Sequence, residues 1–206
     1  MAIIPNYNEE QDLFNRGFRN ICGVDEVGRG CLAGPLMAGA VILPRDFSLN
    51  TLSKVRDSKM LSAKSRSFLH QEIMKLTEFV GIGVVDAEEI DELGINPANN
   101  LAMIRSVQTL PVVPDFILVD GVRISGISIP SKSIIKGDSK CLSIACASIV
   151  AKVVRDTIMV EFDKIYPEYG FEANKGYGTK IHIEALRRHG PCPIHRKSFS
   201  PVNKIG

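Results

Sequence analysis

The sequence predicts an α/β fold, in which helices flank a sheet. Short segments rich in Val, Ile and Leu alternate along the chain with longer segments of helical periodicity. Capping and turn residues mark most of the boundaries between these segments. The 206 residues are 45% apolar, which is enough for one large domain with an ordinary core.

Five segments are predicted to be strands, and the first three are each rich in Val, Ile, Gly or Leu. They are residues 20–27, 34–43, 79–86, 116–119 and 132–136. A tight glycine-rich connection joins the first two. We therefore expect these two strands to pair as an antiparallel hairpin.

The first two predicted helices cover residues 62–78 and 86–92. Ser62 is the expected N-cap of the first of these, because its hydroxyl can accept a free N–H of the first turn. The expected apolar stripe of this helix consists of Phe68, Leu69, Ile73 and Leu76. The second helix is acidic, which suits the positive end of a helix dipole.

Two longer helices are predicted further along the chain. In the first, Asn96 is the expected N-cap and Pro97 the first helical residue of a helix through about residue 110. The second covers 143–166 and ends before Pro167. Small residues crowd its first turns, which predicts a close approach to the sheet.

Composition excludes several classes of protein. No run of about 18 apolar residues is present, so no membrane span is expected. Residues 1–10 lack a basic segment followed by an apolar one and do not resemble a signal peptide. Five cysteines, an odd number without a CxxC pair, predict reduced core residues in a cytoplasmic protein. Cys192 and His195 form half of a zinc motif at most, which favours a structural role for both.

Positive charge is concentrated at the end of the chain. Residues 174–206 carry seven lysines and arginines against one glutamate, whereas the whole chain has a net charge of +2. Such a tail favours a polyanionic partner. A solvated helix face would explain it equally well.

Two adjacent carboxylates are the most informative feature of the chain. Asp25 and Glu26 lie in the first predicted strand, where an unpaired buried carboxylate would be costly. Gly28-Arg29-Gly30 follows, with bare backbone that a ligand can approach and a guanidinium suited to phosphate. Together these groups predict metal-assisted chemistry on a phosphodiester.

Two further aspartates extend this set. Asp120 ends the fourth predicted strand, and Asp138 precedes the long last helix. Either one alone is explained as well by a turn or a helix cap. Combined with Asp25 and Glu26, they predict a site for Mg²⁺ or Mn²⁺ at the strand ends, with two ions about 3.5–4 Å apart during catalysis. The oxygen ligands do not distinguish the two metals.

Strand geometry conflicts with a shared site for the first two acids. Neighbouring residues on a regular strand point to opposite faces, so Asp25 and Glu26 would not both reach one metal pair. We therefore expect a bulge, or the end of the strand at Val27-Gly28, to turn Glu26 toward the site. A regular ladder through Val27 would argue against the shared site.

With these residues, the chain resembles a known family, the type 2 ribonucleases H, and most closely bacterial ribonuclease HII. Single blocks are weak signals, but six of them occur in the family's order across residues 18–201. Ile144-Ala145-Cys146 is a small departure from the family's run of alanines. The six blocks are Asp25-Glu26-Val27-Gly28-Arg29-Gly30, Asp57-Ser58-Lys59, Val119-Asp120-Gly121, Lys136-Gly137-Asp138, the run from Ala147 to Asp156, and Asn174-Lys175-Gly176-Tyr177-Gly178-Thr179.

The resemblance implies a ribonuclease H-like fold, with a five-stranded mixed sheet flanked by helices and a small helical C-terminal extension. It implies three parts of the chain. Residues 1–17 would be an N-terminal extension and 18–172 the catalytic core. Residues 173–206 would be a basic extension that completes the substrate groove. We expect a monomer.

The activity implied is endonucleolytic cutting 5′ of a ribonucleotide, which leaves 3′-hydroxyl and 5′-phosphate ends. Substrates would be RNA–DNA hybrids and duplex DNA that contains single ribonucleotides, with roles in ribonucleotide removal and primer degradation. By resemblance, Asp25, Glu26, Asp120 and Asp138 are the metal-binding carboxylates. The backbone of Gly28-Arg29-Gly30 would read the 2′-hydroxyl, which separates RNA from DNA. Tyr177 would stack on the neighbouring sugar.

Other polar residues are expected to support this site. Ser148, Lys152 and Arg155 share one face of the last long helix, where they could contact phosphates or the acids. An ordinary solvated face is the alternative. Lys59 is expected to contact a backbone phosphate, with a bare surface lysine as the alternative, and Lys175 flanks Tyr177 and fits the same groove. Such contacts would make binding salt-dependent.

Other functions on the same fold agree less well with the residues. A non-catalytic nucleic-acid-binding protein of the same fold would gain nothing from four acids that repel phosphate. A Holliday-junction resolvase or proofreading exonuclease would not need Gly28-Arg29-Gly30 beside Tyr177. The sister type 3 enzyme carries an N-terminal platform domain, which we do not expect because only about 20 residues precede the first predicted strand.

Overall fold

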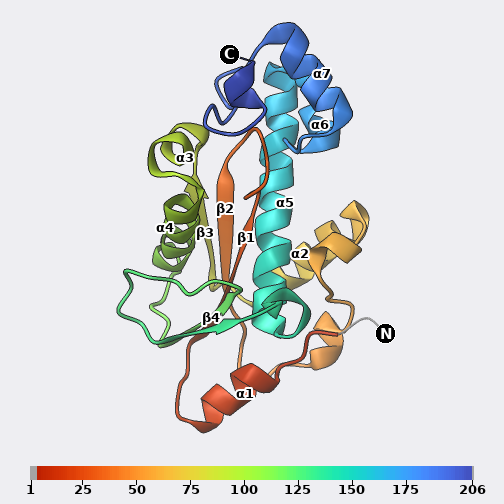
Figure 1. The fold of residues 1–206 in the computed structure, drawn as a ribbon. Coiled ribbons are helices and arrows are strands. Elements are labelled where there is room, and N and C mark those ends of the chain that lie inside the picture. Colours follow the sequence, from red (N-terminus) through yellow and green to blue (C-terminus); the bar gives the residue numbers. More distant parts are fainter. Residues whose placement is uncertain (1–3, 206) are drawn as a thin grey trace.

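The computed structural model describes residues 4–205 and contains the predicted mixed sheet (Figure 1). Its strand order is β3-β2-β1-β4-β5. β2 pairs antiparallel with both β1 and β3, whereas β4 pairs parallel with β1 and β5. All five predicted strands and the hairpin are thereby confirmed. The strands are β1 Ile21–Val27, β2 Leu36–Ile42, β3 Val80–Val85, β4 Phe116–Asp120 and β5 Ser131–Ile134.

Helices cover both faces of the sheet (Figure 1). One face carries α3 and α4, the other carries α5 and α2, and α6 and α7 lie at the far end of α5. The α-helices are α1 Asn8–Asn15, α2 Ala63–Leu76, α3 Ala87–Leu93, α4 Ile95–Gln108, α5 Leu142–Ile165, α6 Phe171–Asn174 and α7 Lys180–His189. The short 3₁₀ helices are η1 Leu49–Leu52, η2 Ser58–Met60, η3 Gly137–Ser139, η4 Pro167–Tyr169 and η5 Val202–Lys204. None of the described helices is long and apolar enough to cross a bilayer.

Glycines in the sheet let α5 lie unusually close to it. A Cβ on Gly23 would lie 2.2 Å from the Ser143 carbonyl carbon, and one on Gly39 would lie 2.4 Å from the Ala147 carbonyl oxygen. The small residues at the start of α5 therefore have the role that the sequence predicts. These contacts fix the first half of α5 against β2 and against β1, the strand that carries Asp25 and Glu26.

Two helix details differ from the sequence prediction. α4 begins at Ile95 with Gly94 as its N-cap, so Asn96 is not the cap and Pro97 lies inside the first turn. Proline is tolerated there because the first-turn N–H groups lack intrahelical partners. Phe68 is 50% exposed instead of belonging to a buried stripe. Ser62 does cap α2, and accepts the Ser65 N–H at 3.1 Å.

An N-terminal helix, α1, was not predicted from the sequence. Glu10, Leu13 and Phe14 are buried on one of its faces, at the i, i+3, i+4 spacing of a packed helix. Because Glu10 is charged, the buried face of α1 does not show an apolar periodicity in the sequence. Glu10 accepts the Ser143 N–H at 2.8 Å, at the start of α5. Residues 1–3 of the predicted N-terminal extension lie outside the described residues.

Candidate active site

Three carboxylates from distant parts of the chain converge at one edge of the sheet. Asp25 lies near the end of β1, Asp120 ends β4, and Asp138 lies in η3. Each offers an oxygen, and the three oxygens lie within 4.8 Å of one another. The parallel register of Val24 with Val119 brings the first two acids side by side. Gly137 N–H donates to Asp120 Oδ1 at 2.5 Å, and this bond fixes the segment that carries Asp138.

The charges of this cluster are poorly compensated within the protein. Burial raises the pKa of Asp25 well above its usual range, and the neighbouring acids raise it further. Burial and repulsion by Asp138 raise the pKa of Asp120. The hydrogen bond from the Gly137 N–H and the Lys59 charge lower it, but by less. A divalent cation would relieve this repulsion, and close hard oxygen donors are the ligands that Mg²⁺ and Mn²⁺ prefer. The residues therefore fit such an ion.

The expected backbone irregularity before Gly28 is wrong. β1 pairs regularly with β2 through Val27 opposite Met37, so no bulge turns Glu26 over. Glu26 lies outside the cluster of three acids. Nevertheless, the β1–β4 ladder stops at Val24, and the uncovered Glu26 lines the same cavity as Asp25. Burial and the Asp120 charge raise the pKa of Glu26, whereas the Arg29 charge lowers it.

A groove extends on both sides of the acids. On one side is a cavity of about 180 Å³ that contains Asp25, Glu26, the Gly28-Arg29-Gly30 loop and Tyr177. On the other side is a cavity of about 430 Å³ that contains Asp138 and Lys136. Asp120 and Lys59 line both cavities. We name these the loop cavity and the lysine cavity.

The Gly28-Arg29-Gly30 loop is anchored at one glycine and open at the other. Gly28 has a φ of +87°, and a Cβ there would lie 2.3 Å from Arg155 Nε. Gly30 is exposed, and a Cβ there would meet no atom within 4 Å. Arg29 donates to Asn96 Oδ1 at 2.6 Å. A ligand can therefore reach the main chain at Gly30.

Arg155 is fully buried and lines neither cavity of the groove. It donates to the main-chain carbonyls of Pro35, Ala33 and Lys175 at 2.9, 3.2 and 2.9 Å. Arg155 lies on the same face of α5 as Ser148, as predicted. At Arg155, however, the loop after β1 covers this face. Its role is thus to hold this loop, and the predicted phosphate contact is wrong.

Sequence reasoning missed a second buried arginine, Arg196. It is also fully buried and donates to the carbonyls of Gly34 and Arg29 at 3.0 Å each. Nothing in the sequence distinguishes it from the other basic residues of the tail. The two arginines support the loop from beneath without a carboxylate hydrogen-bond partner among the described residues.

Lys152 and Tyr177 lie together at the groove. Lys152 donates to Asp156 at 2.6 Å, and its amine lies 5.7 Å from the centroid of the Tyr177 ring. Tyr177 is 41% exposed, so one part of its ring remains available for stacking. The structure therefore brings two separately predicted site residues together in the loop cavity.

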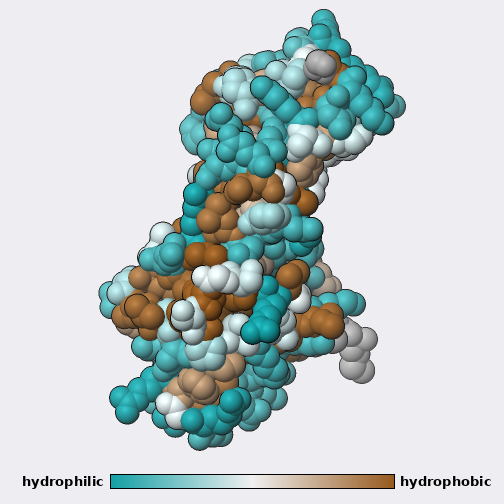
Figure 2. Space-filling model, turned by 60° about the vertical axis from the view of Figure 1, so that its left-hand side comes forward, coloured by the Kyte–Doolittle hydropathy of each residue, from teal (hydrophilic) through white to brown (hydrophobic). Residues whose placement is uncertain are grey.

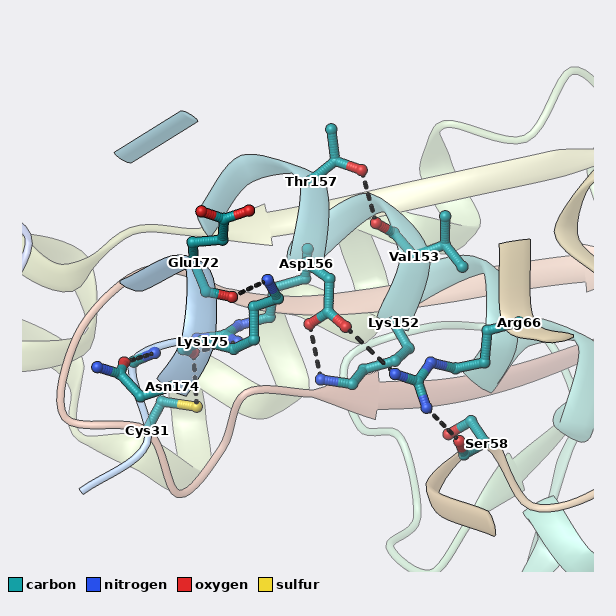
Figure 3. Close-up of polar contacts among 12 residues, drawn as sticks. Cys31, Ser58, Arg66, Lys152, Val153, Asp156, Thr157, Glu172, Asn174 and Lys175 are labelled. Carbon is teal, nitrogen blue, oxygen red and sulfur yellow. Dashed lines mark hydrogen bonds and ion pairs between the residues drawn. The ribbon is translucent and has the colours of Figure 1, made fainter. Parts of the chain in front are cut away.

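A chain of polar contacts leads from Lys152 through Asp156 and Arg66 to Ser58 (Figure 3). Asp156 also pairs with Arg66 at 3.7 Å, and Arg66 donates to the Ser58 carbonyl at 3.0 Å. The Ser58 and Ser148 hydroxyls lie 3.0 Å apart. Ser148 is buried, and its hydrogen bond lowers the pKa of Asp25. Its position is that of a support for the acids.

The two remaining predicted contacts are Lys59 and Lys175. Lys59 is largely exposed and lies 3.5 Å from Asp138 Oδ2. Lys175 has a φ of +52°, and its amine turns back to the Glu172 carbonyl (Figure 3). Lys59 lines both cavities of the groove, whereas Lys175 lines neither and instead borders a separate pocket beside Arg66 and Asp156. Their phosphate contacts stay predictions.

The raised pKa values predict a pH-dependent stability of the metal-free protein. Acids with a raised folded-state pKa stabilise the fold below their unfolded pKa of about 4, and this contribution is lost as the pH rises through the folded pKa. We expect the Tm of wild type minus that of Asp120→Asn, in EDTA, to fall as the pH rises from about 4. Both proteins share the other titrating groups, so the contributions of those groups to the pH dependence of the Tm cancel in this difference. One such group is His195, whose burial lowers its pKa to about 4.

Calorimetry over a pH series checks this prediction. Added Mg²⁺ should raise the wild-type Tm more at higher pH, because it binds deprotonated carboxylates. A difference in Tm that grows with pH in EDTA would contradict the repulsion within the cluster.

Comparisons with known proteins agree with this geometry. The family model described as Ribonuclease HII matches residues 22–202. A ribonuclease HII of Caldicellulosiruptor saccharolyticus is 50% identical over 200 residues, which cover 97% of this chain and 96% of the relative. One of Dehalococcoides mccartyi is 47% identical over 204 residues, with 99% and 97% covered.

A solved structure shows the same fold. The crystal structure of ribonuclease H2 from Pyrococcus horikoshii superposes with a TM-score of 0.76 at 25% identity, over 90% of this chain and 96% of that one. The predicted ribonuclease H-like fold is thereby confirmed.

Proposed function

The chain belongs to the ribonuclease HII family, and from this premise we propose that it is a divalent-metal-dependent endonuclease that cuts 5′ of ribonucleotides. Ribonuclease H activity follows from the family. The finer proposal is cutting of RNA–DNA hybrids and of single ribonucleotides in duplex DNA, with 3′-hydroxyl and 5′-phosphate products. Such an enzyme would serve ribonucleotide removal and primer degradation. The observation that carries the proposal is the convergence of three carboxylates, two buried and one half-buried, beside an open main-chain loop.

The acids are proposed to hold the metal and the scissile phosphate between the two cavities. Asp25, Asp120 and Asp138 would supply ligand oxygens, with Glu26 close enough to bind through water or to orient it. Bound divalent ions would activate the attacking water and stabilise the leaving 3′ oxygen. Lys59 neutralises part of the negative charge at Asp138 and would contact the phosphate.

Recognition of the ribose is proposed to take place in the loop cavity. Gly30 leaves its main chain open to a 2′-hydroxyl, which can both donate and accept hydrogen bonds. Tyr177 offers an exposed aromatic face to the neighbouring sugar. The buried arginines keep the loop in place without occupying the cavity.

A methyl group at Gly30 tests this recognition. Gly30→Ala should fold normally, because its Cβ meets open space and the residue has no positive φ. We expect an unchanged Tm and a KM at least about tenfold higher for a duplex with one ribonucleotide, since the methyl group displaces the sugar from the reacting position. Steady-state kinetics beside a melting curve check this. An unchanged KM would remove Gly30 from the ribose site.

The proposed function is tested with matched duplexes that contain one ribonucleotide, a long hybrid or only DNA. We expect cutting of the first two with Mg²⁺ or Mn²⁺, and none of the all-DNA duplex or in EDTA. Tight binding of all three duplexes without cutting would favour the non-catalytic alternative instead.

A further inference from the structure

We propose that Lys136 binds a backbone phosphate of the cut strand on the 5′ side of the scissile bond, an inference that rests on the proposed function. The first observation concerns its backbone. Within residues 4–205, the non-glycine residues with positive φ are Lys136 and Lys175, at +57° and +52°. This left-handed region strains residues with a Cβ, and glycine, asparagine and aspartate adopt it far more readily than lysine.

The turn at Lys136 helps to place Asp138 in the acid cluster, but the turn does not depend on a lysine side chain. Its carbonyl accepts the N–H and the hydroxyl of Ser139, and the next N–H, that of Gly137, donates to Asp120. These contacts place Asp138 in the cluster. None of them involves the Lys136 side chain, because they use the main chain of Lys136 and Gly137, so glycine at position 136 would keep them with less strain.

The side chain of Lys136 has no structural role among the described residues. It is exposed and takes part in none of the ion pairs there. It lines the lysine cavity together with Lys59, Asp120 and Asp138. Lys59 is already paired with Asp138. The amine of Lys136 is thus the uncommitted positive charge of this cavity, and a strained residue with a free side chain at a reactive site points to a ligand.

The order of the groove decides which phosphate this is. The loop cavity contains Gly30 and Tyr177, the proposed contacts of the ribonucleotide and the sugar beside it. The acids that would hold the scissile phosphate, on the 5′ side of that ribonucleotide, come next. The lysine cavity lies beyond them, so the strand that enters it is the segment 5′ of the cut.

Lys136→Gly separates this role from a structural one, because glycine relieves the backbone strain. We expect a Tm equal to or above that of wild type, a KM about five- to tenfold higher, and a salt dependence of binding that is shallower by about one charge. Lys136→Arg should retain most of the affinity. Lys140→Ala is the matched control, because it removes an exposed lysine four residues away that does not line the cavity.

Neutral methylphosphonates locate the contact. They replace single phosphates along the ribonucleotide strand, and wild-type enzyme and Lys136→Gly are compared at each position. One substitution 5′ of the cut should weaken wild type about as much as Lys136→Gly does, and should weaken the variant no further. Additive losses at every 5′ position, or a coupled position 3′ of the ribonucleotide, would overturn the inference while leaving the proposed function intact. Failure of wild type to cut the unmodified strand would overturn both.

Discussion

Replacing Asp120 with asparagine is expected to lower turnover by at least about 100-fold while making the metal-free protein more stable. Asparagine keeps the shape of the side chain, and its amide oxygen can still accept the Gly137 N–H. The change removes one of the negative charges that raise the pKa of Asp25. Because repulsion falls, the Tm in EDTA should rise, and the further rise caused by Mg²⁺ should shrink.

Turnover of a ribonucleotide duplex and melting curves with and without Mg²⁺ measure both effects. Glu161→Gln is the matched control, since it neutralises an exposed acid at the far end of α5. Wild-type turnover in Asp120→Asn would remove this residue from the metal site. A lower Tm in EDTA would show that Asp120 supports the fold and is not repelled within it.

Replacing Arg155 with methionine is expected to cost about 3 kcal/mol or more of unfolding free energy. Methionine fills much of the volume but leaves the carbonyls of Ala33, Pro35 and Lys175 without their donor. It also removes the contact beneath Gly28. The loop should loosen, so KM for a ribonucleotide duplex should rise together with the loss of stability.

Urea unfolding compares this variant with Arg188→Met, which removes an exposed arginine from α7 and should change stability by less than about 0.5 kcal/mol. Arg155→Lys should recover part of the stability, because an ammonium can still donate to the carbonyls. Equal stability of the two methionine variants would contradict the supporting role of Arg155.

The sequence allowed the sheet and most of the acid site to be predicted because each leaves a local trace. Most of the strands are rich in apolar residues, and an aspartate at the end of a continuous apolar run stands out, as Asp120 does in β4. Glu26 shows the limit of this reasoning. The side chains of β1 alternate regularly between the two faces of the sheet. The bulge that we expected to bring Glu26 into a cluster of four acids does not occur.

The buried supports of the site could not be predicted for a different reason. Arg155 and Arg196 donate to main-chain carbonyls, which every residue has, so their partners leave no mark in the sequence. Charged residues are also expected at the surface. The same expectation conceals α1, whose buried face includes Glu10.

The position and end groups of the nick test the central claim most directly, that metal-activated water attacks the phosphate 5′ of a ribonucleotide. A duplex with one ribonucleotide, labelled at each end in turn, would be cut with Mg²⁺ or Mn²⁺ and its fragments resolved to one nucleotide. We predict a 3′-hydroxyl upstream and a 5′-phosphate on the fragment that begins with the ribonucleotide. A cut 3′ of the ribonucleotide with a cyclic 2′,3′-phosphate, retained in EDTA, would mean that the 2′-hydroxyl is the nucleophile and would contradict the account.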